Sequence, residues 1–163
     1  MQEIVALSNL VRQQPVSELV RDAYDRRARQ LWSYGRRLGL DGEAAEDVMQ
    51  EAFIRLLDKP SRSIDNLDAW LFRVVHNLAI DHLRRARSRN GSPAIRTISS
   101  AADEDRIALW AAVDDLPERQ RAVVYLRYRA DLEFRAIGHI LGIGEGGARA
   151  NCARALESLR KRW

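Results

Sequence analysis

The chain has 163 residues, of which 46% are hydrophobic and 31% charged, and this suits one ordinary globular domain or two very small ones. Cys152 is the only cysteine, so the sequence excludes an internal disulfide framework and a zinc site built from several cysteines. No apolar run approaches the length of a membrane span, and residues 1–15 lack the pattern of a signal peptide. We therefore expect a cytoplasmic protein without membrane insertion.

The basic residues are unusual in kind. The net charge is +4, and of the 27 basic residues all but Lys59 and Lys161 are arginine. Guanidinium groups make paired hydrogen bonds to phosphates and guanine edges, which favours a nucleic-acid partner. A GC-rich genome gives the same bias through its codons, and composition alone favours this plainer explanation.

The first half of the chain predicts three helices. Apolar residues recur at mostly helical spacing over residues 17–37, and Gly39 ends that pattern. Asp41 suits the N-cap of a second helix, and Asn66 suits the N-cap of a long third helix that runs to about Arg87. A polar loop over residues 58–66 separates these two helices. The apolar stripe of the second helix consists of Ala45, Val48, Met49, Ala52, Phe53, Leu56 and Leu57.

The second half begins with a change of composition. Residues 88–102 are rich in serine without a sustained period, which is typical of a linker. A helix is predicted over residues 103–113, and Pro117 suits the first position of the next helix. Two further helical patterns, over residues 132–141 and 145–162, are separated by Gly142-Ile143-Gly144, which indicates a helix-turn-helix. Gly138 provides the small residue that two closely crossing helices need, and Cys152 reads as a small core residue.

The sequence thus predicts an all-α protein of two small helical domains joined by a flexible linker, the second a helix-turn-helix. The expected divisions are an N-terminal extension over residues 1–15, a first domain over 16–87, a linker over 88–102 and a second domain over 103–163.

Three segments resemble the extracytoplasmic-function (ECF) subgroup of bacterial sigma factors. They are residues 44–56 (AAEDVMQEAFIRL), residues 69–85 (AWLFRVVHNLAIDHLRR), and the stretch that begins with LPERQR at residue 116 and ends in the helix-turn-helix. The resemblance covers about residues 16–163 and implies that the first domain is sigma region 2 and the second is sigma region 4. It also implies a factor that binds core RNA polymerase, recognises and melts promoter DNA, and has neither catalytic residues nor a metal or other cofactor.

The resemblance assigns the second helix to polymerase. In the family this helix docks on an arginine-rich clamp of the β′ subunit, which here implies contacts from Asp47, Gln50 and Glu51, with Met49 or Phe53 as apolar support. The simpler explanation is that acidic residues near a helix N-terminus complement the helix dipole.

The third helix resembles the family's reader of the minus-ten promoter element. A base that is read in a single strand needs a pocket with amide groups for its edge and cations for the backbone. The residues so assigned are Asp65, Asn66, Arg73, His76, Asn77, Arg84 and Arg85. Of these, Asp65, Asn66 and Asn77 are expected to line the pocket of a flipped base. For Trp70 we expect core packing in preference to base stacking.

The last helix is expected to read the minus-thirty-five element. Arginine can read guanine and asparagine can read adenine in the major groove, and the exposed residues here are expected to be Arg149, Ala150, Asn151 and Arg154. This stretch departs from the family, because Gly146-Gly147-Ala148 replaces the usual threonine and β-branched residue. Two glycines weaken the start of a helix.

Two other functions remain open at this stage. A stand-alone helix-turn-helix regulator would explain residues 116–163 but not residues 69–85, whereas a sigma-like decoy would bind polymerase without conventional promoter reading. The resemblance further implies contact with the flap of the polymerase β subunit and an anti-sigma factor as a regulator. The promoter sequence, the inducing signal and the genes controlled are not readable from this chain.

Overall fold

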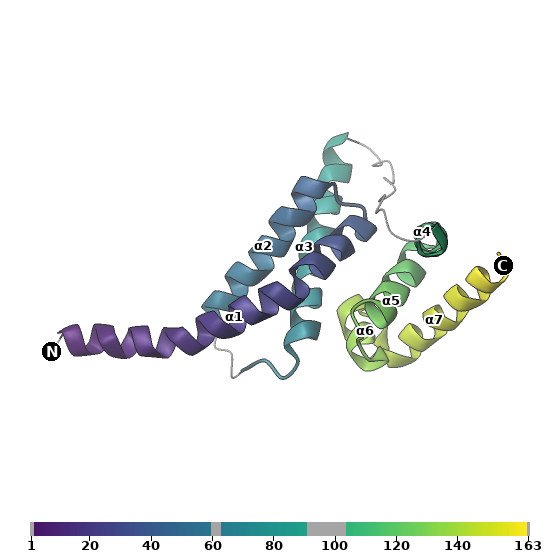
Figure 1. Cartoon of the computed structure of the whole chain (residues 1–163). Helices are drawn as coiled ribbons and strands as arrows, with labels where there is room; N and C mark the ends of the chain where they lie inside the picture. Colours follow the sequence, from purple (N-terminus) through teal and green to yellow (C-terminus); the bar gives the residue numbers. More distant parts are fainter. Residues whose placement is uncertain (1, 60–62, 91–103, 163) are drawn as a thin grey trace.

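The structure, a computed structural model, describes residues 2–59, 63–90 and 104–162, and the part it describes is helical without strands. Its helices, in chain order, are α1 (Gln2–Leu38), α2 (Gly42–Asp58), α3 (Leu67–Asn90), α4 (Glu104–Asp114), α5 (Glu118–Tyr128), α6 (Phe134–Leu141) and α7 (Gly144–Arg160). Helices α1 to α3 form one group and α4 to α7 another (Figure 1), which confirms the predicted all-α, two-domain fold.

The helix boundaries differ from the predicted ones at three places. Helix α1 begins at Gln2 and runs through Pro15, so the backbone of the expected N-terminal extension is helical. Good helix formers such as Gln, Glu, Ala and Leu are frequent there and continue the helix beyond its amphipathic part. Helix α3 continues to Asn90, into the expected linker, and the rest of that linker lies outside the described residues. Pro117 is the N-cap of α5 and not its first residue.

Side-chain caps fix the starts of the second and third helices as the sequence predicts. The carboxylate of Asp41 accepts a hydrogen bond of 2.8 Å from the backbone N–H of Ala44, at the start of α2. The side-chain oxygen of Asn66 accepts one of 3.0 Å from the N–H of Ala69, at the start of α3. Each cap satisfies a donor that the helix itself leaves without a partner, which typically contributes about 1 kcal/mol.

The helix-turn-helix consists of α6 and α7. Gly142 ends α6 in the left-handed conformation, with φ of 66°, which glycine adopts without steric cost. Gly138 lies where the two helices cross, and a Cβ atom added there would be 2.2 Å from the carbonyl oxygen of Gly144. The structure therefore confirms that Gly138 is the small residue at the crossing. Cys152 is also buried, as expected, among the residues of this crossing.

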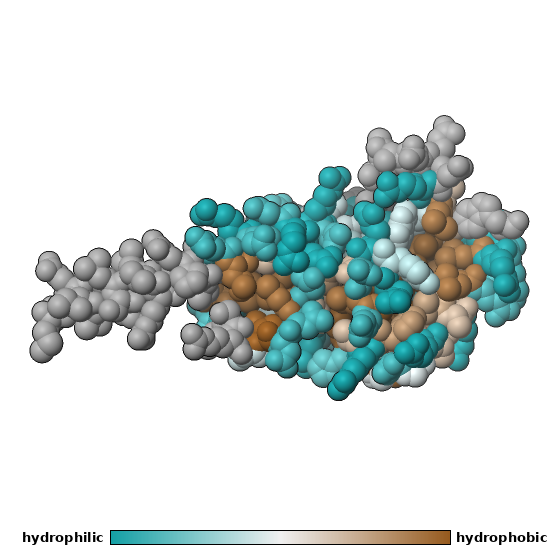
Figure 2. Space-filling model, turned by 60° about the horizontal axis from the view of Figure 1, so that its bottom comes forward, coloured by the Kyte–Doolittle hydropathy of each residue, from teal (hydrophilic) through white to brown (hydrophobic). Residues whose placement is uncertain are grey.

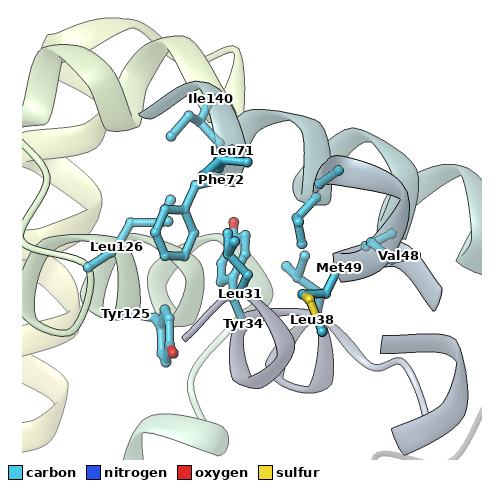
Figure 3. Close-up of a cluster of buried hydrophobic side chains, with 14 of the residues drawn as sticks. Leu31, Tyr34, Leu38, Val48, Met49, Leu71, Phe72, Tyr125, Leu126 and Ile140 are labelled. Atoms are coloured by element: carbon cyan, nitrogen blue, oxygen red, sulfur yellow. The ribbon is translucent and has the colours of Figure 1, made fainter. Parts of the chain in front are cut away.

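The two domains share a continuous apolar core. Figure 3 shows Leu31 and Tyr34 of α1 together with Phe72 of α3, and beside them Tyr125 and Leu126 of α5. All five side chains are fully or almost fully buried. Burying one large apolar side chain contributes about 1.5–3 kcal/mol, so contacts of this kind hold α5 and α6 against α1 and α3. A smaller cluster of Ala112, Val113, Leu116, Val124, Ala155 and Leu159 joins α4, α5 and α7.

Candidate nucleic-acid interface

The outer face of α2 combines carboxylates with exposed apolar side chains. Asp47 and Gln50 are exposed, and Glu51, which is partly exposed, accepts a hydrogen bond of 3.0 Å from Arg55 one turn later. Ile54 and Leu57 are 52% and 53% exposed on the same helix. Figure 2 shows apolar side chains gathered on the face of the molecule it displays, between hydrophilic ones. An exposed apolar patch rimmed by charges is typical of a protein–protein contact.

Two of the residues assigned to polymerase lie behind this surface. Met49 and Phe53 are each only 5% exposed, and the ring of Phe53 packs against that of Tyr24 at 5.0 Å. Neither offers a surface to a partner in this conformation, because both point into the core between α1, α2 and α3. Leu57, which the apolar stripe placed in the core, is instead exposed. The stripe is wider than the area that the neighbouring helices cover, and Leu57 lies at its uncovered edge.

The middle of α3 brings three of the assigned minus-ten residues together. Arg73, His76 and Asn77 line one groove of about 480 Å³, whose other wall is the end of α6. Arg73 and Asn77 are exposed and one helical turn apart, so a guanidinium and an amide face the same side. This pair can contact a phosphate and a base edge at once, which is the chemistry that single-strand reading requires.

The other residues assigned to the minus-ten element lie just before α3 or near its C-terminal end. Asn66 caps the helix eleven residues before Asn77, which at 1.5 Å a residue is about 16 Å along the axis. Asp65 and Asn66 are not among the residues that line the groove at Asn77, so in this conformation they lie apart from it. Arg84 and Arg85 are exposed near the other end, where Arg84 pairs with Asp81 at 3.0 Å. Trp70 packs against the core, as predicted.

His76 lies between the groove and the core. Its Nδ1 is 2.9 Å from the hydroxyl of Tyr34, and the two rings stack with centroids 6.1 Å apart. Burial lowers the pKa of His76 from its ordinary value of 6.5, and the negative charge of Glu118 opposes that shift. Burial also raises the pKa of Tyr34 far above 10, so the phenol keeps its proton. The Nδ1 atom of a neutral imidazole can accept a hydrogen bond from the phenol, whereas a doubly protonated imidazole cannot.

We expect acid to destabilise the protein through His76. Below pH 6.5 the unfolded chain binds a proton that folded His76 does not, so the free energy of unfolding decreases as the pH falls from 6.5 towards the lowered folded pKa. Besides Tyr34 and Glu118, which face His76, the titratable or charged side chains that line the groove are Arg73, Asp81 and His139. When the pH is lowered from 7.5 to 5.5, the stability measured by thermal unfolding should decrease less for His76→Asn than for the wild type. Equal decreases would contradict the role of His76 in acid destabilisation.

Helix α7, which is expected to read the minus-thirty-five element, presents Arg149 and Arg154 on the outside. Arg149 and Arg154 are exposed, and Arg149 both pairs with Glu145 at 2.7 Å and lies 4.9 Å from the ring centroid of Phe134. Asn151 is half-buried and donates a hydrogen bond of 2.8 Å to the carbonyl oxygen of Gly147. Ala150 is also half-buried. The two arginines are therefore the more accessible of the four assigned readers, and the glycine-rich start is helical from Gly144.

Among residues 2–59, 63–90 and 104–162, no group of three or more His, Cys, Asp or Glu side chains could hold a metal ion. None of the helices that the structure describes is both long and apolar enough to cross a membrane.

Comparisons with known proteins match each of the two groups of helices separately. Residues 23–89 match the family described as Sigma-70 region 2, and residues 112–161 match Sigma-70, region 4. The chain is 35% identical over 154 residues to the ECF RNA polymerase sigma factor SigL of Mycobacterium tuberculosis, with 87% of each chain covered. It is 31% identical over 142 residues to SigW of Bacillus subtilis, covering 72% of this chain and 74% of that protein.

A solved structure shows the same fold. The sigma factor RpoE of Bartonella quintana, in complex with the anti-sigma factor NepR, matches with a TM-score of 0.70 at 19% identity, covering 86% of this chain and 94% of that one. Both sigma regions are thus matched in the expected order, each on its own group of helices. The chain belongs to the ECF family of RNA polymerase sigma factors, the proteins that direct promoter-specific initiation of transcription.

Proposed function

We propose that the outer face of α2 docks this sigma factor on the clamp of the polymerase β′ subunit. The observation that carries the proposal is the combination on one face of Asp47, Gln50 and Glu51 with exposed Ile54 and Leu57. Carboxylates meet the arginines of the partner, and the two apolar side chains supply the area that loses contact with water. Ile54 and Leu57 replace Met49 and Phe53 in this role, because only the former pair is exposed.

We further propose that α3 reads the minus-ten element and α7 the minus-thirty-five element. Arg73, His76 and Asn77 are the centre of the first site, because they share one groove. Asn66, Asp65, Arg84 and Arg85 would contact the same strand further along α3. On α7, Arg149 and Arg154 are the main candidates for base and phosphate contacts because they are exposed. Ala150 and Asn151 are half-buried and therefore less accessible to DNA.

The partners of the second domain follow from the same proposal. Helices α4 and α5 carry exposed apolar side chains at Ile107, Leu109 and Tyr128, and side chains of this kind can contact the flap of the β subunit. Such surfaces need cover when polymerase is absent, and an anti-sigma factor is the kind of protein that provides it; the relative from Bartonella quintana is bound to one. We place the protein in the cytoplasm, where polymerase acts.

Reversing the charge of α2 tests the polymerase contact. The double variant Asp47→Lys/Glu51→Lys puts two positive charges opposite an arginine-rich clamp, and like charges across an interface cost several kcal/mol. We expect affinity for core polymerase to decrease at least about a hundredfold, with promoter-dependent transcription in vitro lost and helical circular dichroism unchanged.

The matched control carries the same change of charge elsewhere. Asp115 and Glu157 have side chains that are 68% and 56% exposed in the second domain, far from α2 in the sequence. The variant Asp115→Lys/Glu157→Lys should co-purify with core polymerase like the wild type. Survival of binding in the α2 variant would disprove the docking surface, and equal loss in both variants would show a general effect of charge.

A further inference from the structure

Arg149, one of the two main candidate readers on α7, receives little support from its own helix. Side chains three and four residues apart on a helix contact one another. Gly146 stands three residues before Arg149, and the small, exposed Ala153 stands four residues after it. Cys152, three residues after it, is buried in the core. Glu145, four residues earlier, is the neighbour that does hold it, because its carboxylate accepts a hydrogen bond of 2.7 Å from the guanidinium.

The pair of Arg149 and Glu145 is a weak support at the moment of reading. It faces solvent, since the two side chains are 61% and 47% exposed, and exposed ion pairs contribute little to stability. The carboxylate also occupies an N–H donor that a guanine would need, so the pair has to open when the arginine reads this base. A support that lasts through DNA binding has to come from another part of the domain.

Phe134, the first residue of α6, lies beside the same guanidinium. The guanidinium carbon of Arg149 is 4.9 Å from the centroid of the Phe134 ring, and that of Arg127 on α5 is equally far from it. The negative face of an aromatic ring attracts a cation without using its N–H donors. This contact therefore leaves the hydrogen-bonding edge of Arg149 free for a base.

The ring of Phe134 is itself held in a defined place. It is half-buried, packs against the core and follows the turn between α5 and α6. In that turn the N–H of Leu132 donates a hydrogen bond of 3.0 Å to the carbonyl oxygen of Leu126, and the carbonyl oxygen of Leu132 accepts one of 3.1 Å from Arg127. Asp131 adopts the left-handed conformation with φ of 55°, which aspartate tolerates better than most residues. A specific turn thus fixes the position of the ring.

We propose that Phe134 is a positioning residue for promoter reading, which holds Arg149 in the orientation that recognises a guanine of the minus-thirty-five element. The inference rests on the proposed function, since it uses the assignment of α7 to that element. Recognition of guanine requires two N–H donors of one planar guanidinium to point at the base edge together. A group that fixes this plane in advance reduces the entropy lost on binding. The ring provides the support that Gly146 and Ala153 cannot give.

Selection from a random library tests the proposal. The full chain, assembled with core polymerase, selects from duplex DNA with random bases over the promoter region, and sequencing gives the base preference at each position. Arg149→Ala first identifies the base pair that Arg149 reads, as the position where a preference for guanine is lost. Phe134→Leu should lower the guanine preference at that position about two- to fivefold, the factor for a cation–π contact at an exposed site, and leave the other positions unchanged.

Two further variants separate the charge distribution of the ring from its shape. Phe134→Tyr keeps an aromatic face and should retain the wild-type preference. A polyfluorinated phenylalanine at position 134 keeps a ring of similar size but loses its negative face. It should therefore lower the guanine preference as Phe134→Leu does, even if leucine disturbs the packing. Thermal melting of each variant measures how well the fold is retained.

A comparison of double variants assigns the effect to one arginine. In an Arg149→Ala background, Phe134→Leu should cause no further loss of preference at the Arg149 position. In an Arg154→Ala background it should cause the same loss as in the wild type, because the guanidinium contacts of the ring are with Arg127 and Arg149. Effects of residues that share no contact are expected to add.

The outcomes separate this inference from the proposed function. An unchanged guanine preference in the fluorinated variant would overturn the positioning role. An equal loss at every position, together with a lower melting temperature, would also overturn it, because the ring would then serve packing alone. In both cases a loss of preference in Arg149→Ala would leave the proposed reading by α7 standing. If Arg149→Ala altered no position, that reading would fail and the positioning role with it.

Discussion

Gly138→Ala should lower the free energy of unfolding of the second domain by about 3 kcal/mol, at the upper end of the cost of overpacking. The added Cβ would lie 2.2 Å from the carbonyl oxygen of Gly144 and 2.7 Å from the backbone nitrogen of Glu145. Both atoms belong to the backbone, so no side chain can rotate away, and α6 and α7 must move apart. Thermal and guanidinium unfolding followed by circular dichroism measure the loss, which corresponds to about 10 °C in Tm for a chain of this size.

The same substitution at Gly146 provides the control. An added Cβ there has no neighbour within 4 Å, and the residue lies in the first turns of α7. Alanine in a helix is favoured over glycine by up to about 1 kcal/mol, so Gly146→Ala should leave stability unchanged or raise it. If Gly138→Ala melted like Gly146→Ala, the helices would cross less closely than the structure has them.

Tyr34→Ala should cost about 3–5 kcal/mol, the usual range for removing a large buried aromatic side chain. Tyr34 is fully buried and packs against three rings from two other helices: Phe72 at 5.6 Å and His76 at 6.1 Å on α3, and Tyr125 at 5.5 Å on α5. Its removal leaves a cavity at the place where α1, α3 and α5 meet. Both domains should therefore lose stability, which unfolding monitored by tryptophan fluorescence and by circular dichroism would report.

Tyr34→Phe separates packing from hydrogen bonding at the same position. This variant keeps the ring and removes only the hydroxyl bonded to His76, a loss of about 1 kcal/mol. If Tyr34→Phe destabilised the protein as much as Tyr34→Ala, the hydrogen bond and not the packing would dominate at this site. A small effect of both variants would indicate that the residue is not buried as described.

Local sequence determined the starts of α2 and α3 and the end of α6, because these signals are local. The caps Asp41 and Asn66 each bond to a backbone N–H three residues on, and the turn at Gly142 needs only its own φ. Gly138 was also predictable, since two helices joined by so short a turn must cross closely. The resemblance in turn rests on segments of contiguous sequence, and the family matches to regions 2 and 4 cover those segments.

Which part of each helix is exposed was decided by tertiary structure. Met49, Phe53 and Leu57 all belong to one apolar stripe, yet the first two are buried and Leu57 is 53% exposed. Periodicity gives the direction of a stripe but not the area that neighbouring helices cover. The separation of Asn66 from the groove at Asn77 likewise follows from the length of helix between them.

The contact between the two domains is the feature that the sequence predicts least. Arg37 and Asp114 are 77 residues apart, and no local pattern distinguishes them from the many other charged residues of the chain. Only the packing of α5 and α6 on α1 and α3 brings them together. The sequence by itself determined two helical units that match sigma regions 2 and 4, whereas tertiary packing decided that they rest against each other, because long-range contacts depend on every surface at once.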